Sequence, residues 1–219
     1  AWRRAGTVLS VGFNRRFAPL MRRLRAALGN AGSITATYVV NVPPLAPQSW
    51  ILDSEQGGGV VLAEGGHFID SLSFLAGGQP VEVAAIPAGE HSYQASLRFG
   101  DGSVASLIYT TQALGHGPKE ILTVAGRGVL AHLNDFRSLT LWGTRRRRSF
   151  RSKQDKGHEG ALRAWVDAIR AGSEQPVDML EIVAVSEATI CLRESLATGA
   201  PVTVRLDRYV DALAAAATE

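Results

Sequence analysis

Apolar residues recur along this chain with two different periods, which predict helices toward both ends and strands between them. Spacings of three and four residues, which bury one face of a helix, predict four helices. These helices span about residues 18–28, 58–76, 159–171 and 179–198. Short β-branched or alternating runs predict eight strands. The strands lie at about 7–13, 33–42, 80–86, 92–99, 103–112, 119–125, 128–133 and 137–142.

The predicted strands follow one another through short turns, which favours an antiparallel sheet. One such turn is Gly100-Asp101-Gly102, because glycine and aspartate suit a hairpin connection. Helices that come before and after the strands can cover only one face of the sheet efficiently. We therefore predict an α+β fold with a mainly antiparallel open sheet. The second face, if it is apolar, would be covered by another copy of the protein.

The composition is that of a chain able to build a sizeable core, with 219 residues of which 46% are hydrophobic. A formal net charge of +3 is small for this length and does not demand a polyanionic partner. No run approaches the roughly 18 apolar residues of a membrane span, and the first residues lack the apolar core of a signal peptide. One cysteine, Cys191, excludes an internal disulfide framework, and we expect it in a buried helix position of a cytoplasmic protein.

Glu64, His67 and Asp70 are the strongest candidates for chemistry. Their spacing of three residues places them along one strip of the predicted helix. Gly65-Gly66 cost roughly 1 kcal/mol each relative to alanine inside a helix, but they leave room for a backbone or a ligand to approach. An imidazole with an ordinary pKa of about 6.5 can accept and return a proton at cellular pH. A lone histidine can equally be a satisfied core residue, so the pattern alone leaves both interpretations open.

The run of basic residues at 145–153 has two interpretations. Clustered arginines with an interleaved aromatic residue, Phe150, are one way of gripping nucleic-acid phosphates. An edge strand kept soluble by charge has the same composition. We favour the edge strand, because no recognised nucleic-acid module surrounds the run.

Residues 126–131 satisfy the letters of a dinucleotide-binding fingerprint, in its variant that ends with alanine, since they follow a predicted strand. A true fingerprint needs a full helix before the next parallel strand, but the strand at 137–142 begins too soon. A turn between two strands is therefore the favoured interpretation.

In four segments, the order and spacing of motifs resemble the C-terminal domain of the Gfo/Idh/MocA oxidoreductases, the glucose-fructose oxidoreductase and inositol dehydrogenase family. Residues 11–19 are similar to the last strand and linking helix of that family's dinucleotide-binding domain. The substrate loop and active-site helix are matched by residues 39–50 and 57–70. Residues 155–162 resemble the C-terminal end of the domain, particularly in the subgroup fused behind a zinc-type alcohol dehydrogenase module.

The resemblance implies hydride exchange between NAD or NADP and a secondary alcohol of a sugar, cyclitol or similar polyol. His67 matches the family's proton-relay histidine. Well-studied members place an aspartate four residues before it, where this chain has Ala63, so Glu64 can substitute only if the helix is locally displaced. Asp70 matches a position that is often acidic, as a proton carrier or as a carboxylate that supports the helix or orients the imidazole.

The resemblance also implies that part of the enzyme lies outside this chain. The family's Glu-Lys-Pro lysine and its glycine-rich phosphate turn belong to a nucleotide-binding domain, and Glu-Lys-Pro does not occur here. Residues 1–30 would be the terminal strand and linking helix of that otherwise absent domain, and residues 31–219 the C-terminal α+β domain. Because the chain begins with Ala1 rather than methionine, we expect a piece of a longer protein. We expect no tight NAD(P) binding and no activity from these residues alone.

Several further residues are candidates for binding. Asn14, Arg15 and Arg16 follow a predicted strand end, where they could face the cofactor or an acidic substrate group, or could instead be a helix cap with two solvated arginines. Weaker substrate-pocket candidates are Asn41, Trp50, Lys156 and His158. No metal site is predicted. A different class of function also stays open, namely a non-catalytic module that only dimerises or binds a partner.

Overall fold

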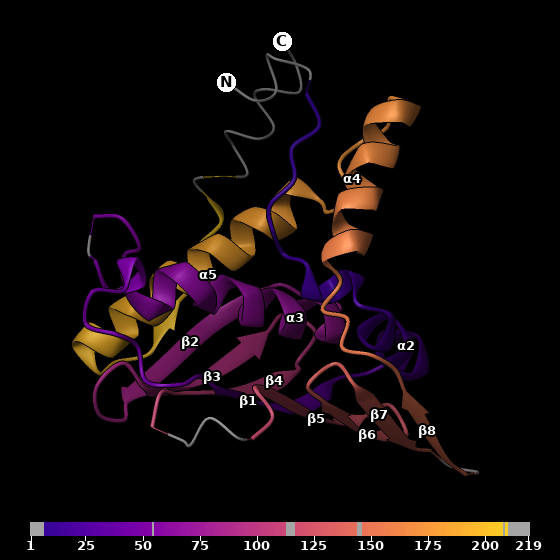
Figure 1. The fold of residues 1–219 in the computed structure, drawn as a ribbon, viewed down its shortest axis with the longest axis horizontal. Helices are drawn as coiled ribbons and strands as arrows, with labels where there is room; N and C mark the ends of the chain where they lie inside the picture. The colour runs from indigo at the N-terminus through magenta and orange to yellow at the C-terminus, as the bar shows by residue number, and fades with distance from the viewer. Residues whose placement is uncertain (1–6, 54, 113–116, 144–145, 208, 210–219) are drawn as a thin grey trace.

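The computed structural model describes residues 7–53, 55–112, 117–143, 146–207 and 209, which build one nine-stranded sheet with helices along one of its faces (Figure 1). The strand order is β8-β7-β6-β5-β1-β4-β3-β2-β9. β1 pairs with β4 in parallel, and every other neighbouring pair is antiparallel. The predicted α+β class with a mainly antiparallel open sheet is confirmed.

The strands are short and follow the predicted runs closely in the middle of the chain. Their bounds are β1 Ile34–Asn41, β2 Pro80–Pro87, β3 Tyr93–Phe99, β4 Val104–Thr110, β5 Glu120–Gly126, β6 Val129–Asn134, β7 Ser138–Trp142, β8 Arg147–Arg151 and β9 Val202–Thr203. The glycine turn at 100–102 connects β3 to β4, as predicted. β9 adds a two-residue edge that the apolar pattern did not predict.

Four α-helices occur in the described part of the chain: α2 Pro19–Leu28, α3 Gly66–Ala76, α4 His158–Ala171 and α5 Met179–Thr198. In Figure 1, α2, α3 and α5 lie along one side of the sheet, whereas α4 points away from it. Asp178 caps α5 by accepting hydrogen bonds from the N–H groups of Leu180 and Glu181. None of the helices in the described ranges is long and apolar enough to cross a membrane.

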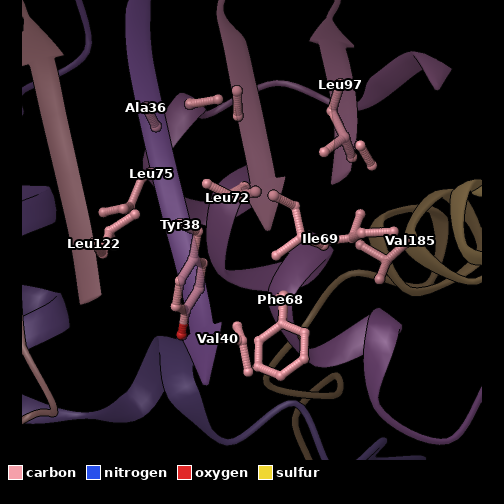
Figure 2. Close-up of a cluster of buried hydrophobic side chains, with 14 of the residues drawn as sticks. Ala36, Tyr38, Val40, Phe68, Ile69, Leu72, Leu75, Leu97, Leu122 and Val185 are labelled. Atoms are coloured by element: carbon pink, nitrogen blue, oxygen red, sulfur yellow. The ribbon is translucent and has the colours of Figure 1, made fainter. Parts of the chain in front are cut away.

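The core lies between the sheet and the helices α3 and α5, and α5 packs directly on β2, where the Ala85 N–H donates to Ser195 Oγ. Along β1 the side chains of Ala36, Tyr38 and Val40 are buried, while the alternate residues face away. Figure 2 shows α3 contributing Phe68, Ile69, Leu72 and Leu75 to the same cluster, with Val185 of α5 beside Ile69. The side chains of Phe68, Ile69, Leu72 and Leu75 are at most 1% exposed, so α3 is held rigidly against the sheet.

The opposite face of the sheet is left open by the helices of the described residues. Thr35 and Thr37 of β1 are exposed, and Val39, Ile108 and Ile121 are only partly buried. Leu130 of β6 and Trp142 of β7 are 45% and 40% exposed. These seven side chains, some hydroxyl-bearing and some apolar, form what we call the open face of the sheet.

The predicted strand at 7–13 is wrong. In the structure this segment belongs to no strand of the described sheet, and its end is turned, with the Phe13 N–H donating to the Val11 carbonyl at 2.7 Å. The indole N–H of Trp165 in α4 donates to the Val8 carbonyl at 3.0 Å. A strand needs a neighbour for its backbone groups, which an apolar sequence cannot supply by itself.

The basic run at 145–153 and the glycine-rich segment at 126–131, each of which had two interpretations from sequence, both contribute to the sheet. β8 is an edge strand whose arginines are exposed, while Arg145 itself lies outside the described residues. Residues 126–128 form the turn between β5 and β6. Arg127 in that turn donates to the carbonyls of Gly29 at 2.9 Å and Ala76 at 2.6 Å, which terminate α2 and α3. Both predictions, of an edge strand and of a turn, are confirmed, and Cys191 is buried in α5 as predicted.

Gly157 and Gly172 bracket α4 and allow a matched test of how that helix is anchored. Both have positive φ, at 85° and 61°, but only Gly157 is enclosed. A Cβ atom there would overlap the carbonyl oxygen of Asn14 and the backbone nitrogen of Ala18, whereas nothing lies within 4 Å of one at Gly172. We predict that Gly172→Ala lowers the free energy of unfolding by about 1 kcal/mol and Gly157→Ala by at least about 3 kcal/mol, measured by urea unfolding. Equal losses would contradict this packing.

Candidate functional site

Glu64 and His67 lie at an irregular start of α3. A π-helical turn, Val61–Gly65, precedes α3 and bonds each N–H to a carbonyl five residues back. A turn of this kind holds more residues than an α-helical turn, so the side chains before it are rotated relative to those after it. Glu64 lies within this turn, so the helix is locally irregular at the residue whose substitution for the expected aspartate would require a displacement.

The Glu64 carboxylate faces the sheet. Tyr109 of β4 donates its hydroxyl to Glu64 Oε2 at 2.5 Å, and Lys119 Nζ lies 3.8 Å from Oε1. The side chain of Glu64 is 21% exposed and that of Lys119 is 38% exposed. Glu64 is thus held from inside by a neutral donor and from outside by a partly solvated cation.

His67 is half-buried at the first turn of α3. The Phe13 ring meets the imidazole edge-on, with 6.1 Å between centroids. Its Nδ1 atom is buried and has no hydrogen-bond partner among the described residues. Gly66 keeps the helix close to its neighbours, because a Cβ atom there would lie only 3.3 Å from the Phe13 ring and 3.4 Å from Thr189 Oγ1.

The charges around His67 favour a neutral imidazole. Burial, and after it the positive charge of Arg15, lower the pKa of His67 to about 4. The carboxylates of Glu64 and Glu120 oppose this shift, and His158 adds to it slightly. At neutral pH the imidazole is therefore unprotonated and a weak base, and the charge of Glu64 is one of the two influences that favour its protonation.

Glu120, at the start of β5, collects three donors. Arg15 binds its two carboxylate oxygens at 2.8 and 3.0 Å, Lys156 Nζ donates at 2.7 Å, and the Tyr38 hydroxyl donates at 2.5 Å. Burial alone would raise the pKa of Glu120, but the hydrogen bonds and charges of Arg15 and Lys156 outweigh it and lower the pKa to about 2. Glu120 is therefore an ionised, buried centre beside the site.

Asp70 belongs to a separate ion cluster one helical turn beyond His67. Arg16 binds its carboxylate at 2.6 to 3.1 Å and also reaches Glu181 at 2.8 Å. Asp70 is fully buried, so its oxygens are committed to Arg16 rather than to the imidazole. The hypotheses of Asp70 as proton carrier or imidazole-orienting group are not supported by this geometry, which leaves helix support.

Asn14, Arg15 and Arg16 are not solvent-facing. All three are at most 7% exposed, and Arg15 also lies over the Phe68 ring at 4.8 Å. Asn14 makes no side-chain helix cap and instead donates to the Lys156 carbonyl at 2.7 Å. The two interpretations from sequence were contact with a cofactor or an acidic substrate group, and a helix cap with solvated arginines. In the structure the three side chains bind internal partners instead. They join the start of the chain to β5, α3 and the loop before α4.

The weaker substrate-pocket candidates are scattered. Lys156 is bound to Glu120, and His158 is exposed at the start of α4, within electrostatic reach of His67. Asn41 ends β1 with its Oδ1 atom buried and without a partner in the described part of the chain. Trp50, in a short 3-10 turn, is 60% exposed, and no recorded contact joins it to His67. The structure therefore brings Lys156 and His158 toward the site and leaves Trp50 at the surface.

Sequence reasoning missed Tyr109, Lys119 and Glu120. Lys119-Glu120 at the start of a strand was a detectable signal, because a charged pair is unusual where a buried strand begins. Tyr109 gave no such signal, since tyrosine is common in strands. As for metals, the described ranges contain no group of three or more His, Cys, Asp or Glu residues arranged to hold an ion.

Comparison with known proteins places this geometry in a family. The family model described as GFO/IDH/MocA C-terminal domain matches residues 22–130. An oxidoreductase domain protein from Kribbella flavida has the same fold, with a TM-score of 0.78 and 17% identity over 93% of this chain and 67% of that one.

Two named enzymes share the fold at similarly low identity. Levoglucosan dehydrogenase in complex with NADH has a TM-score of 0.75 and 20% identity over 91% of this chain and 67% of its own. Aldose-aldose oxidoreductase from Caulobacter crescentus has a TM-score of 0.77 and 17% identity over 92% of this chain and 65% of its own. The chain thus spans about two-thirds of the length of these structures. Residues 22–130 match the family model of the GFO/IDH/MocA C-terminal domain, and the fold of the described chain is that of these oxidoreductase structures.

Proposed function

We propose that this chain is the substrate-binding and oligomerisation domain of an NAD(P)-dependent oxidoreductase that acts on a secondary alcohol of a sugar, cyclitol or similar polyol. The observation that carries the proposal is the half-buried imidazole of His67, whose Nδ1 atom has no partner among the described residues and which lies within electrostatic reach of the Glu64 carboxylate that Tyr109 holds. The names of two structural neighbours, a levoglucosan dehydrogenase and an aldose-aldose oxidoreductase, support the substrate class.

In this proposal the chain supplies the group that removes the hydroxyl proton of the substrate. His67 accepts the hydroxyl proton of the alcohol as the carbon is oxidised, and the charge of Glu64 stabilises the imidazolium. Arg15 opposes that charge and keeps the resting imidazole neutral. Proton transfer of this kind is worth typically 10² to 10⁴ in rate. Lys156, His158 and Asn41 are the proposed substrate contacts nearest to this chemistry, with Trp50 peripheral.

The described residues do not fit a dinucleotide site. The glycine-rich segment 126–128 is a hairpin turn whose arginine is used on backbone carbonyls. Asn14, Arg15 and Arg16 bind internal partners. We therefore propose that NAD or NADP, the hydride acceptor, is held mainly by another domain, to which residues 1–30 connect. On this proposal residues 31–219 are the C-terminal domain, and the chain alone is inactive. The fusion behind a zinc-type alcohol dehydrogenase module and the cytoplasmic location remain predictions from sequence.

The open sheet face supports the oligomerisation part of the proposal. Val39, Ile108 and Ile121 lie on neighbouring central strands and are only partly buried within one chain. A second copy related by two-fold symmetry would cover the same residues on both molecules. The alternative, a module that only binds a partner, would use this face without requiring His67.

The isolated chain provides a direct test of how the site is divided. We expect calorimetric titration with NADH to show no tight binding. In a second experiment, levoglucosan, glucose and inositol are added at millimolar concentrations, and we expect at least one of them to shift the NMR signals of the His67 ring. His132 on the open face serves as an internal control. Tight, stoichiometric NADH binding would contradict the assignment of the cofactor to another domain. If none of the polyols shifts the His67 signals, the result favours the alternative that this chain only binds a partner.

The low pKa of His67 predicts an acid-sensitive fold. Since the unfolded chain titrates this group near its ordinary value of about 6.5 and the folded chain near 4, the unfolded state binds more protons between these values. Stability should therefore fall as the pH drops from 6.5 to 4. His67→Gln should reduce this loss by roughly 1–2 kcal/mol after allowance for solvent screening, measured by urea unfolding at several pH values. The control His132→Gln should keep the full loss, and an unchanged slope in His67→Gln would refute the burial of a neutral imidazole.

If the open face is the contact surface of a dimer, a single charged substitution at its centre should dissociate that dimer. Ile108→Glu places a carboxylate at the centre of the face, where it would be desolvated in the dimer but solvated in the monomer. We expect sedimentation to give a dimer for the wild type and a monomer for this variant, with a melting temperature of the monomer lowered by only a few degrees. Ile169→Glu on α4, where the side chain is 49% exposed, should leave the dimer intact. A wild-type monomer would remove this part of the proposal.

A further inference from the structure

We propose that Tyr109 is a positioning residue, whose hydroxyl holds the Glu64 carboxylate beside His67. The inference rests on the proposed role of His67 as the proton acceptor, and it adds a residue of β4 to the site. Tyr109 would act through Glu64, with no contact to substrate.

The ring of Tyr109 is held more firmly than the carboxylate it binds. It is 1% exposed and stacks on Tyr93 of β3, with 5.4 Å between centroids and 5° between planes. Phe68 of α3 packs against it at 6.1 Å. The burial of the ring and its contacts with Tyr93 and Phe68 restrict where the hydroxyl can lie. The 2.5 Å contact to Glu64 Oε2 therefore fixes the carboxylate, not the tyrosine.

The hydrogen bond from Tyr109 matters for Glu64 because its other partner, Lys119, is partly exposed to solvent. Lys119 Nζ lies 3.8 Å from Oε1 and is partly solvated, so an ion pair with Lys119 alone would leave the carboxylate free to follow the lysine into solvent. Burial, and the contact with Glu64, raise the pKa of Tyr109 far above its ordinary value. The hydroxyl consequently remains a proton donor throughout the working pH range, and Glu64 remains the acceptor.

Tyr93 provides a matched comparison within the same stack. It is 2% exposed and nearly parallel to Tyr109, but its hydroxyl has no hydrogen-bond partner among the described residues. A Cβ atom at Gly65 would lie 3.8 Å from that hydroxyl, so Tyr93 also faces the π-helical turn. Replacing each tyrosine by phenylalanine removes one oxygen from an equivalent environment, and only one of the two oxygens touches Glu64.

The experiment compares Tyr109→Phe with Tyr93→Phe in the isolated chain, using the ring ¹⁵N signals of His67 at pH 7 to report which nitrogen carries the proton. A carboxylate fixed beside the ring favours one tautomer. We expect wild type and Tyr93→Phe to show the same dominant tautomer, and Tyr109→Phe to shift the population toward a mixture by a factor of about three or more. This readout needs no turnover, so it stands apart from the test of the dehydrogenase function.

A double-variant cycle separates positioning from general packing. If Tyr109 acts by placing the charge of Glu64, then Tyr109→Phe should change the His67 signals in the wild type and leave them unchanged in the Glu64→Gln background. Thermal melting of each variant identifies a simple loss of fold. Equal effects of Tyr109→Phe in both backgrounds, or equal effects of the two tyrosine variants, would overturn the proposal.

Discussion

The buried carboxylate of Glu120 is the interaction on which the rest of the site depends. It accepts from the guanidinium of Arg15, the ammonium of Lys156 and the hydroxyl of Tyr38, and so ties the start of the chain, the loop before α4 and β1 to β5. Removing Arg15, which binds both carboxylate oxygens, would leave the buried charge of Glu120 with only Lys156 and Tyr38, which is more costly than losing an exposed ion pair. These segments are therefore held together as one unit around His67.

Arg15 and Arg16 are adjacent in the chain but serve two different clusters. The 3-10 turn that contains them, Arg15–Phe17, directs Arg15 to Glu120 and Arg16 to Asp70 and Glu181. The first cluster sets the electrostatic surroundings of His67, whereas the second fixes α3 against α5. A consequence is that Asp70 is bound in a different cluster from Glu64 and His67, although the sequence spacing predicts all three on one strip of a helix.

Much of the fold was readable from sequence because it follows from local periodicity. The alternation in β1 and the helical spacing of α3 and α5 required burial on one side, and short turns required neighbouring strands to be antiparallel. The parallel pairing of β1 with β4 was not readable, since it places a later strand beside an earlier one across the intervening α3, β2 and β3. Residues 7–13 show the converse limit, because an apolar run is only half of a strand until another backbone lies beside it.

By itself, the sequence determined that a histidine and two carboxylates lie on one helical strip, and that an open antiparallel sheet has helices on one face. Only the tertiary structure decided which carboxylate accompanies the histidine. A π-helical turn rotates Glu64 toward Tyr109, and Arg16 withdraws Asp70 into an ion pair. The physical reason is that periodicity assigns a side chain to a face, whereas its partner and its charge state depend on groups brought from distant parts of the chain. The pKa of His67 is lowered first by burial and then by the charge of Arg15, which lies 52 residues earlier in the chain, while Glu64 and the distant Glu120 oppose the shift. The local pattern contains only Glu64, one of these contributions.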